Sequence, residues 1–78
     1  MQTEYKYLIF KQADSSGLKT QIWECRNKNS NDLLGIVKWY SNWRQYCYFT
    51  FADAVYSTGC MNDITHFINQ LMEERKRV

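Results

Sequence analysis

The feature that most constrains the fold is the stretch from Leu34 to Phe51, which is dense in aromatic and β-branched residues and holds two of the three tryptophans. Such side chains favour strands, because they fit a pleated, half-buried surface. The dipeptide Ser41-Asn42 divides the stretch, and asparagine tolerates the positive φ angle that a two-residue hairpin turn requires. The sequence therefore predicts two antiparallel strands joined by a tight turn at Ser41-Asn42.

Two further strands are expected before this hairpin and one helix after it. Alternating apolar residues predict strands over residues 4–12 and 18–27, with a turn cluster between them. Residues 54–57 fit either a short edge strand or an irregular crossover. The apolar residues that recur at three- and four-residue spacing, as in an amphipathic helix, are Met61, Ile64, Phe67, Ile68, Leu71 and Met72. Asn62 is the predicted N-cap of that helix.

The resulting expectation is an α+β fold, in which an antiparallel meander of about four strands carries one C-terminal amphipathic helix on one face. Residues 1–78 are too few for a second core and are expected to form a single domain. The absence of proline and the 45% hydrophobic content argue against disorder. Glu73 to Arg77 is predicted to be a solvated helix end rather than a phosphate-binding tail.

Charge and cysteine content bear on the class of partner and on the cellular compartment of the protein. A net charge of +2 neither supports nor excludes nucleic-acid binding, since dedicated binders usually carry a larger or more clustered basic excess. The three cysteines are widely spaced and odd in number, which indicates free thiols in a reducing compartment. The first residues lack the features of a signal peptide, and no apolar run approaches the length of a membrane span. We therefore expect a cytoplasmic protein with no membrane contact.

One helix can cover only one face of the sheet, so large aromatic side chains must remain on the other face. In the fourth strand we predict that Trp43, Cys47, Phe49 and Phe51 face inward, whereas Arg44, Tyr46, Tyr48 and Thr50 face outward. In the third strand Lys38 and Tyr40 share one face and Val37 and Trp39 share the other, and the pattern does not decide which pair is covered. The surplus of exposed aromatics is the main indication of function.

This surplus favours a non-enzymatic binding module that pairs with itself or with another protein, because Tyr, Trp and Arg commonly anchor protein interfaces. The candidate binding residues are Lys38, Tyr40, Arg44, Tyr46 and Tyr48, together with Trp39 if the third strand has the opposite register. The alternative is single-stranded nucleic-acid binding by the same face, in which aromatic rings stack on bases and cations attract phosphates.

Two sets of residues could form chemical sites but also fit ordinary structural roles. Cys25, Cys47, Cys60 and His66 could form a zinc set, but structural zinc ligands usually come in close pairs, and here the nearest two are six residues apart. Cys60 with His66 could act as a thiol nucleophile and its base, yet their spacing points the histidine away from the helix start. We therefore expect no catalytic residue, no metal site and no cofactor.

Two segments of the chain resemble a group of small uncharacterised bacterial and bacteriophage proteins. They are Gly35 to Phe49, which fits a WY-x-x-WR-x-Y-C-[FY]-F core, and Gly59 to Ile68, which fits a C-[LM]-x-DI-x-x-F helix entry. The resemblance implies a sheet-plus-helix fold and a phage or mobile-element context, but it implies no catalytic residue. Small phage proteins often bind and block a host protein, so inhibition of a host factor is a hypothesis from that context.

Overall fold

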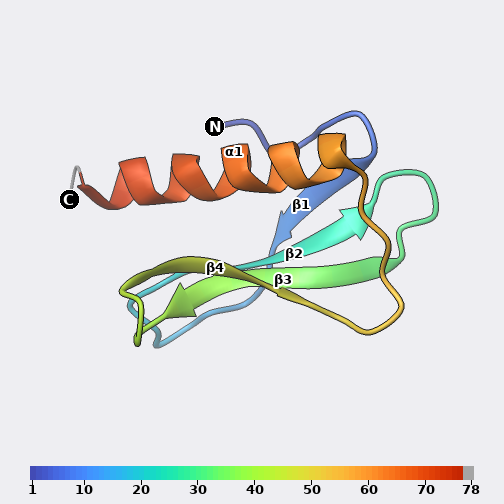
Figure 1. Ribbon diagram of the computed structural model, residues 1–78. Coiled ribbons are helices and arrows are strands. Elements are labelled where there is room, and N and C mark those ends of the chain that lie inside the picture. The colour runs from blue at the N-terminus through green and yellow to red at the C-terminus, as the bar shows by residue number, and fades with distance from the viewer. Residues whose placement is uncertain (77–78) are drawn as a thin grey trace.

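The chain folds into a four-stranded antiparallel sheet with a helix across one of its faces, as a computed structural model describes it for residues 1–76 (Figure 1). The elements are β1 (Leu8–Gln12), β2 (Ile22–Asn27), β3 (Leu33–Tyr40), β4 (Gln45–Thr50) and α1 (Thr58–Lys76). The strand order β1-β2-β3-β4, with antiparallel neighbours throughout, confirms the predicted meander and the α+β fold. Arg77, the end of the predicted helix tail, and Val78 lie outside the described residues.

The first two strands are shorter than the sequence predicts. Residues 4–7 form a turn instead of extending β1, with Tyr5 N donating to Leu8 O at 2.8 Å. The chain before this turn folds back along the outer edge of β1, where Phe10 N donates to Thr3 O at 2.8 Å. Strand β2 likewise begins at Ile22 rather than at residue 18. Periodicity located both strands but placed their starts four residues too early.

The β3–β4 hairpin closes through four residues rather than two. Tyr40 pairs with Gln45, so the loop consists of residues 41–44. Trp43 N donates to Tyr40 O and Arg44 N donates to Ser41 O, both at 3.2 Å. The positive φ falls on Arg44, at 53°, and not on the asparagine of the predicted turn. Four-residue loops built on such turns are a common alternative, and two extra residues leave the face alternation of β4 unchanged.

The core lies between the sheet and α1. Its buried residues are Tyr5, Leu8, Phe10, Cys25, Val37, Tyr46, Ile64, Phe67 and Leu71. Phe67 is the centre of this cluster, since its ring stacks on Phe10 with centroids 4.0 Å apart and meets Trp23 edge-on at 5.1 Å. Ile64, Phe67 and Leu71 of the predicted apolar stripe are buried, and Ile68 and Met72 pack against them, whereas Met61 is 52% exposed.

Helix α1 begins four residues before its predicted cap. Ser57 Oγ accepts a hydrogen bond from Cys60 N at 3.1 Å, which makes Ser57 the N-cap in place of Asn62. Residues 51–57 form no strand, so the irregular crossover is the correct alternative. Tyr56 fixes this crossover to the sheet, because its hydroxyl donates to Leu34 O at 2.9 Å. Within residues 1–76, no helix has the combination of length and apolar character needed to cross a membrane.

The predicted faces of β4 are inverted. Tyr46 and Tyr48 face α1, and Tyr46 is only 5% exposed, whereas Phe49 and Cys47 lie on the uncovered side. The reason is that a tyrosine can bury its ring while its hydroxyl finds a partner at the border of the core. Gln21 N donates to Tyr46 Oη at 3.1 Å, and the hydroxyl oxygens of Tyr48 and Tyr56 lie 2.6 Å apart. Ranking the two rows by polarity alone therefore chose the wrong one.

Candidate binding site

The sheet face opposite α1 is uncovered and divides into a polar half and an aromatic half. Strand alternation and pairing place on it Ile9, Lys11, Ile22, Glu24, Arg26, Ile36, Lys38, Tyr40, Cys47 and Phe49. The first five belong to β1 and β2, and the last five belong to β3 and β4. The former group holds three charged side chains, whereas both aromatic rings, Tyr40 and Phe49, belong to the latter.

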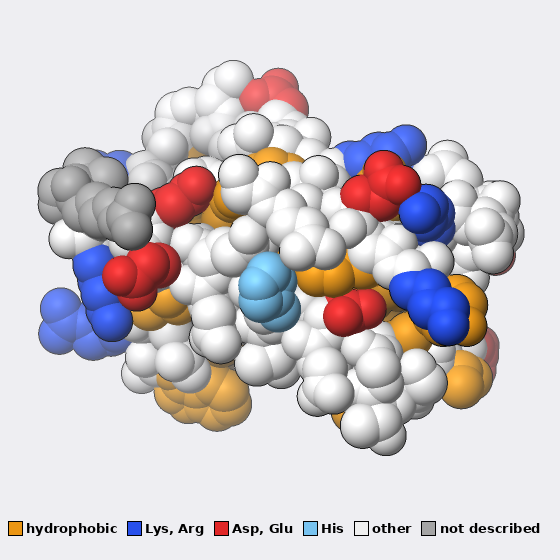
Figure 2. Space-filling model, turned by 90° about the horizontal axis from the view of Figure 1, so that it is seen from above, with side chains coloured by type: hydrophobic (Ala, Val, Ile, Leu, Met, Phe, Trp, Pro, Cys, Tyr) orange, Lys and Arg blue, Asp and Glu red, His pale blue; other side chains and the backbone are white. Residues whose placement is uncertain are grey.

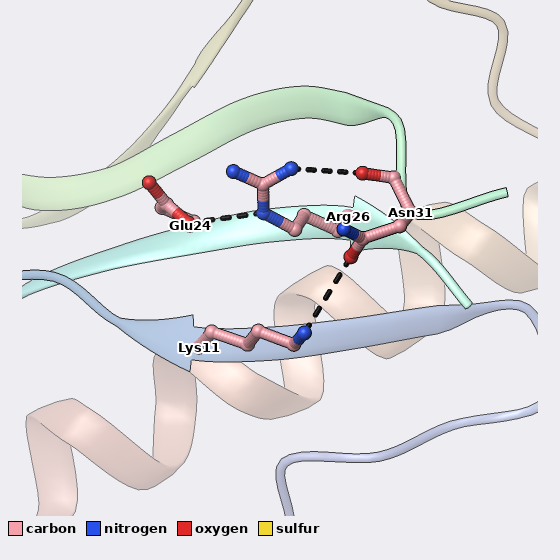
Figure 3. A network of polar contacts seen from close by, with 4 residues as sticks. All are labelled: Lys11, Glu24, Arg26 and Asn31. Carbon is pink, nitrogen blue, oxygen red and sulfur yellow. Dashed lines mark hydrogen bonds and ion pairs between the residues drawn. The ribbon is translucent and has the colours of Figure 1, made fainter.

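In the polar half the charged side chains contact each other or Asn31 (Figure 3). Arg26 Nε donates to Glu24 Oε1 at 3.0 Å, and Arg26 Nη1 donates to the backbone oxygen of Asn31 at 2.8 Å. Lys11 Nζ reaches Asn31 Oδ1 at 3.5 Å. Figure 3 shows these side chains in front of the strands with the helix behind them, so they lie on the uncovered side. Since these partners are already engaged, this half has less capacity for a ligand.

The aromatic half forms a continuous surface, which we call the aromatic patch and define as Ile36, Lys38, Tyr40, Trp43 and Phe49. The Tyr40 ring meets Trp43 edge-on at 5.1 Å and Phe49 at 6.0 Å. Lys38 Nζ lies 4.7 Å from the Phe49 ring centre, within range of a cation–π interaction. Trp43, in the hairpin loop, is 67% exposed. The patch thus combines three rings, one aliphatic side chain and one cation on a surface that no element of residues 1–76 covers.

The structure separates the six candidate residues predicted from the sequence. Lys38 and Tyr40 belong to the aromatic patch, but Tyr46 and Tyr48 lie beneath α1 on the opposite side of the sheet. Trp39 also faces α1, and the Arg75 guanidinium covers its ring at 4.0 Å. The remaining candidate, Arg44, is exposed and lies beside Trp39 in a shallow pocket of about 280 Å³ near the end of α1.

Sequence reasoning missed Phe49 and misplaced Trp43. Both were assigned to the inner row because they are the more apolar members of their strand, whereas they form the uncovered surface. One signal could have identified them. Lys38 and Tyr40 share a face, and a hairpin loop of either two or four residues puts Cys47 and Phe49 on that same face, joined by Trp43 if the loop has two.

On the covered side, a cluster of polar groups lies within the core beside β4. Burial raises the pKa of the Cys25 thiol from 9.0 to about 11. Burial, reinforced by the hydrogen bond with Tyr56, also raises the pKa of Tyr48 above its ordinary value. Both shifts keep the groups neutral, because a charge is costly in an apolar environment. These groups fit structural roles in the core.

The residues considered for metal binding or thiol chemistry are dispersed. His66 Nδ1 lies 2.8 Å from the hydroxyl of Tyr5, so its ring is engaged with the N-terminal segment rather than with Cys60. Among residues 1–76, no three histidine, cysteine or acidic side chains come together as metal ligands would. The outer surface of α1 presents acidic and basic side chains scattered among neutral polar ones (Figure 2).

The chain is similar to the "Uncharacterized 9.3 kDa protein" of Acholeplasma phage L2. The two sequences are 42% identical over 72 residues, which make up 92% of this chain and 92% of the relative. No protein-family model matches the chain, and no solved structure matches it. The phage relative supports the resemblance to small phage and bacterial proteins, whereas the sequence motif by which that group was recognised stays a prediction.

Proposed function

Because the chain belongs to the same family as the 9.3 kDa protein of Acholeplasma phage L2, we propose that it is a non-enzymatic binding module whose aromatic patch docks onto a protein. The phage origin of the relative favours a host protein as the partner, which the docked module would inhibit. Self-association through the patch is the other form of the same proposal. Photocrosslinking distinguishes the two forms by the mass of the crosslinked adduct.

One observation carries this proposal, namely the exposure of Trp43 at 67% beside the ring of Tyr40. Its ring leans edge-on against Tyr40, and Tyr40 in turn leans against Phe49. An exposed tryptophan that is already held in place gives up little conformational entropy when a partner covers it. Tryptophan and tyrosine are also the residues most enriched at the energetic centres of protein interfaces.

Single-stranded nucleic acid is the second candidate ligand, because Lys38 lies among aromatic rings on an open four-stranded sheet. Two observations weigh against it. The Lys38 ammonium already lies over the Phe49 ring, and Arg26, on the same face of the sheet, is paired with Glu24. Binding of a labelled oligothymidine that weakens steeply with salt would favour this candidate, whereas salt-independent or absent binding would exclude it.

Photocrosslinking in cells that produce the protein tests the proposal. A benzophenone amino acid replaces Trp43 in one variant and Asn69, on the exposed side of α1, in the control. We expect position 43 alone to give a discrete adduct, of twice the protein mass for self-association or of a new mass for another protein. The adduct should disappear when Tyr40→Ser is added and persist with Val55→Ser, which alters a residue that is 88% exposed outside the patch. Equal yields at positions 43 and 69, or no adduct at either, contradict the proposal.

A further inference from the structure

The two edges of the sheet differ in whether another segment of the described chain pairs with them. The outer edge of β1 is occupied by the N-terminal segment, through the Phe10 N to Thr3 O hydrogen bond and the bridge between Glu4 and Ile9. Strand β4 forms the other edge, and no strand of the described residues pairs with its outer side. Proteins usually protect such an edge with lysine, proline or a bulge, and β4 (Gln45–Thr50) has none of these.

Alternation along β4 identifies the backbone groups that point outward. Phe51 N donates inward to Leu34 O of β3 at 3.0 Å, whereas Tyr46 N points away from β3 toward Met72 Sδ at 3.4 Å. The amides of Tyr48 and Thr50 share the outward orientation of Tyr46. A thioether is a weak acceptor on a flexible side chain, so a peptide carbonyl can replace Met72 at this amide.

An apolar groove runs beside this edge. It has a volume of about 370 Å³ and lies between the helix-facing side chains of β4 and one row of α1. Tyr48 and Tyr56 form one wall, and Ile64 and Ile68 form part of the other. Met72 continues the helix row by one more turn, over the amide of Tyr46. The groove therefore follows the direction of the open edge.

The far end of the edge is basic. Arg44, Arg75 and Lys76 line the pocket beside Trp39, and Figure 2 shows Lys and Arg side chains next to Asp and Glu side chains at this end of the molecule. Since α1 runs antiparallel to β4, the apolar groove adjoins the Thr50 end of the strand and the basic pocket adjoins its Gln45 end. A peptide that runs antiparallel to β4, from its Thr50 end to its Gln45 end, would meet the apolar groove first and the basic pocket after it.

We propose that the β4 edge binds an extended peptide segment of another protein, which adds to the sheet antiparallel to β4 and lies beneath α1. Apolar side chains opposite Thr50 and Tyr48 enter the groove, and an acidic residue follows beyond the position opposite Tyr46. The outward amides supply the backbone hydrogen bonds that hold an added strand, and the groove and the basic pocket supply selectivity. This site lies on the opposite side of the sheet from the aromatic patch and does not depend on it.

Packing decides against a second copy of this chain as the occupant. In an antiparallel pair of β4 strands, the side chains offered to the groove would be the helix-facing ones of the other molecule, such as Tyr46 and Tyr48, and these already pack beneath that molecule's own α1. An extended peptide with a downstream Asp or Glu complements Arg44, Arg75 and Lys76 instead.

Selection from a displayed library of random 12-residue peptides, followed by fluorescence polarisation of the enriched peptides, tests the proposal. We expect alternating apolar residues followed by Asp or Glu, and binding weakened at least about tenfold, or about 1.4 kcal/mol, by Thr50→Pro. That substitution removes one outward amide and obstructs the added strand, whereas Thr50→Ala keeps the amide and serves as the matched control. Circular dichroism verifies that both variants fold.

Charge reversal provides a second test that leaves the edge intact. Arg44→Glu with Lys76→Glu changes two exposed residues and should shift the selected downstream residues from acidic to basic. Peptides that bind Thr50→Pro as well as the wild type, or no enrichment at all, overturn the proposal. So does a wild-type dimer that Thr50→Pro converts to a monomer, because the edge would then be occupied by a second copy.

Discussion

The ring of Tyr48 lies over Gly35, so that a β-carbon at Gly35 would stand 2.7 Å from Tyr48 Cζ and 2.7 Å from the backbone oxygen of Phe49. In the register of β3 and β4, Tyr48 pairs with Val37 and leans diagonally across the strand. Gly35→Ala should therefore lower the free energy of unfolding by about 1–3 kcal/mol, as overpacking of a core does. Urea denaturation measures the loss.

Gly59→Ala is the matched control for this prediction. A β-carbon at Gly59 meets only Ser57 Oγ, at 3.7 Å, and alanine favours the helix over glycine by up to about 1 kcal/mol. The control should therefore be neutral or slightly stabilising. If Gly35→Ala proved as harmless as Gly59→Ala, Tyr48 would not lie over β3.

Tyr46 should behave as a core residue and not as a surface anchor. Tyr46→Phe removes the acceptor of the Gln21 amide and should cost about 1 kcal/mol of unfolding free energy. Tyr46→Ala also removes the ring beside Trp39 and should cost about 3–5 kcal/mol. Thermal or urea unfolding distinguishes the two variants. A loss below about 1 kcal/mol for Tyr46→Ala would place the side chain at the surface.

The sequence was sufficient for the order of the elements but not for the faces of β4. The helix stripe of Ile64, Phe67 and Leu71 was predictable, because its periodicity is a local property of the chain. Tyr46 faces α1 and Phe49 lies on the uncovered side, which is the reverse of the prediction. The reason is that burial of a tyrosine depends on a partner for its hydroxyl. That partner, the amide of Gln21, lies on another part of the chain.

The candidate sites also differ in how far the sequence predicts them. Lys38 and Tyr40 were identified because they alternate with the buried Val37 and the helix-facing Trp39. The groove at the β4 edge had no sequence signal, since it arises where Ile64 and Ile68 of α1 meet Tyr48 of β4. Residues so distant in sequence are brought together only by the packing angle of the helix, which periodicity does not specify.

The stability of the protein should fall above pH 9. Burial raises the pKa of Cys25 from 9.0 to about 11, so the folded state holds its proton while the unfolded chain loses it. The contribution of the Cys25 thiol to the free energy of unfolding is fully present below pH 9. It is lost as the pH rises to about 11, and the loss amounts to up to about 2–3 kcal/mol. Urea denaturation at a series of pH values measures the slope.

Cys25→Ala is the control for this pH dependence. The variant should have a flatter profile between pH 9 and 10, where the thiol is the first of the buried groups to ionise on unfolding. Tyr48 contributes in the same direction at higher pH, because its pKa is also raised. An equally steep decline in the variant near pH 9 would assign the effect to other groups.

The three thiols should differ in reactivity, and the difference reports on the binding surfaces. Cys25 is 0% exposed, whereas Cys47, on the uncovered face, and Cys60, at the start of α1, are half-buried. With a disulfide reagent, Cys25 should react more slowly by about three orders of magnitude or more, since it requires global opening. A protein docked on the aromatic patch should then protect Cys47, which pairs with Lys38, while a peptide at the β4 edge should protect neither Cys47 nor Cys60. Protection of Cys60 alone would contradict both proposed surfaces, and mass spectrometry of the labelled fragments distinguishes these patterns.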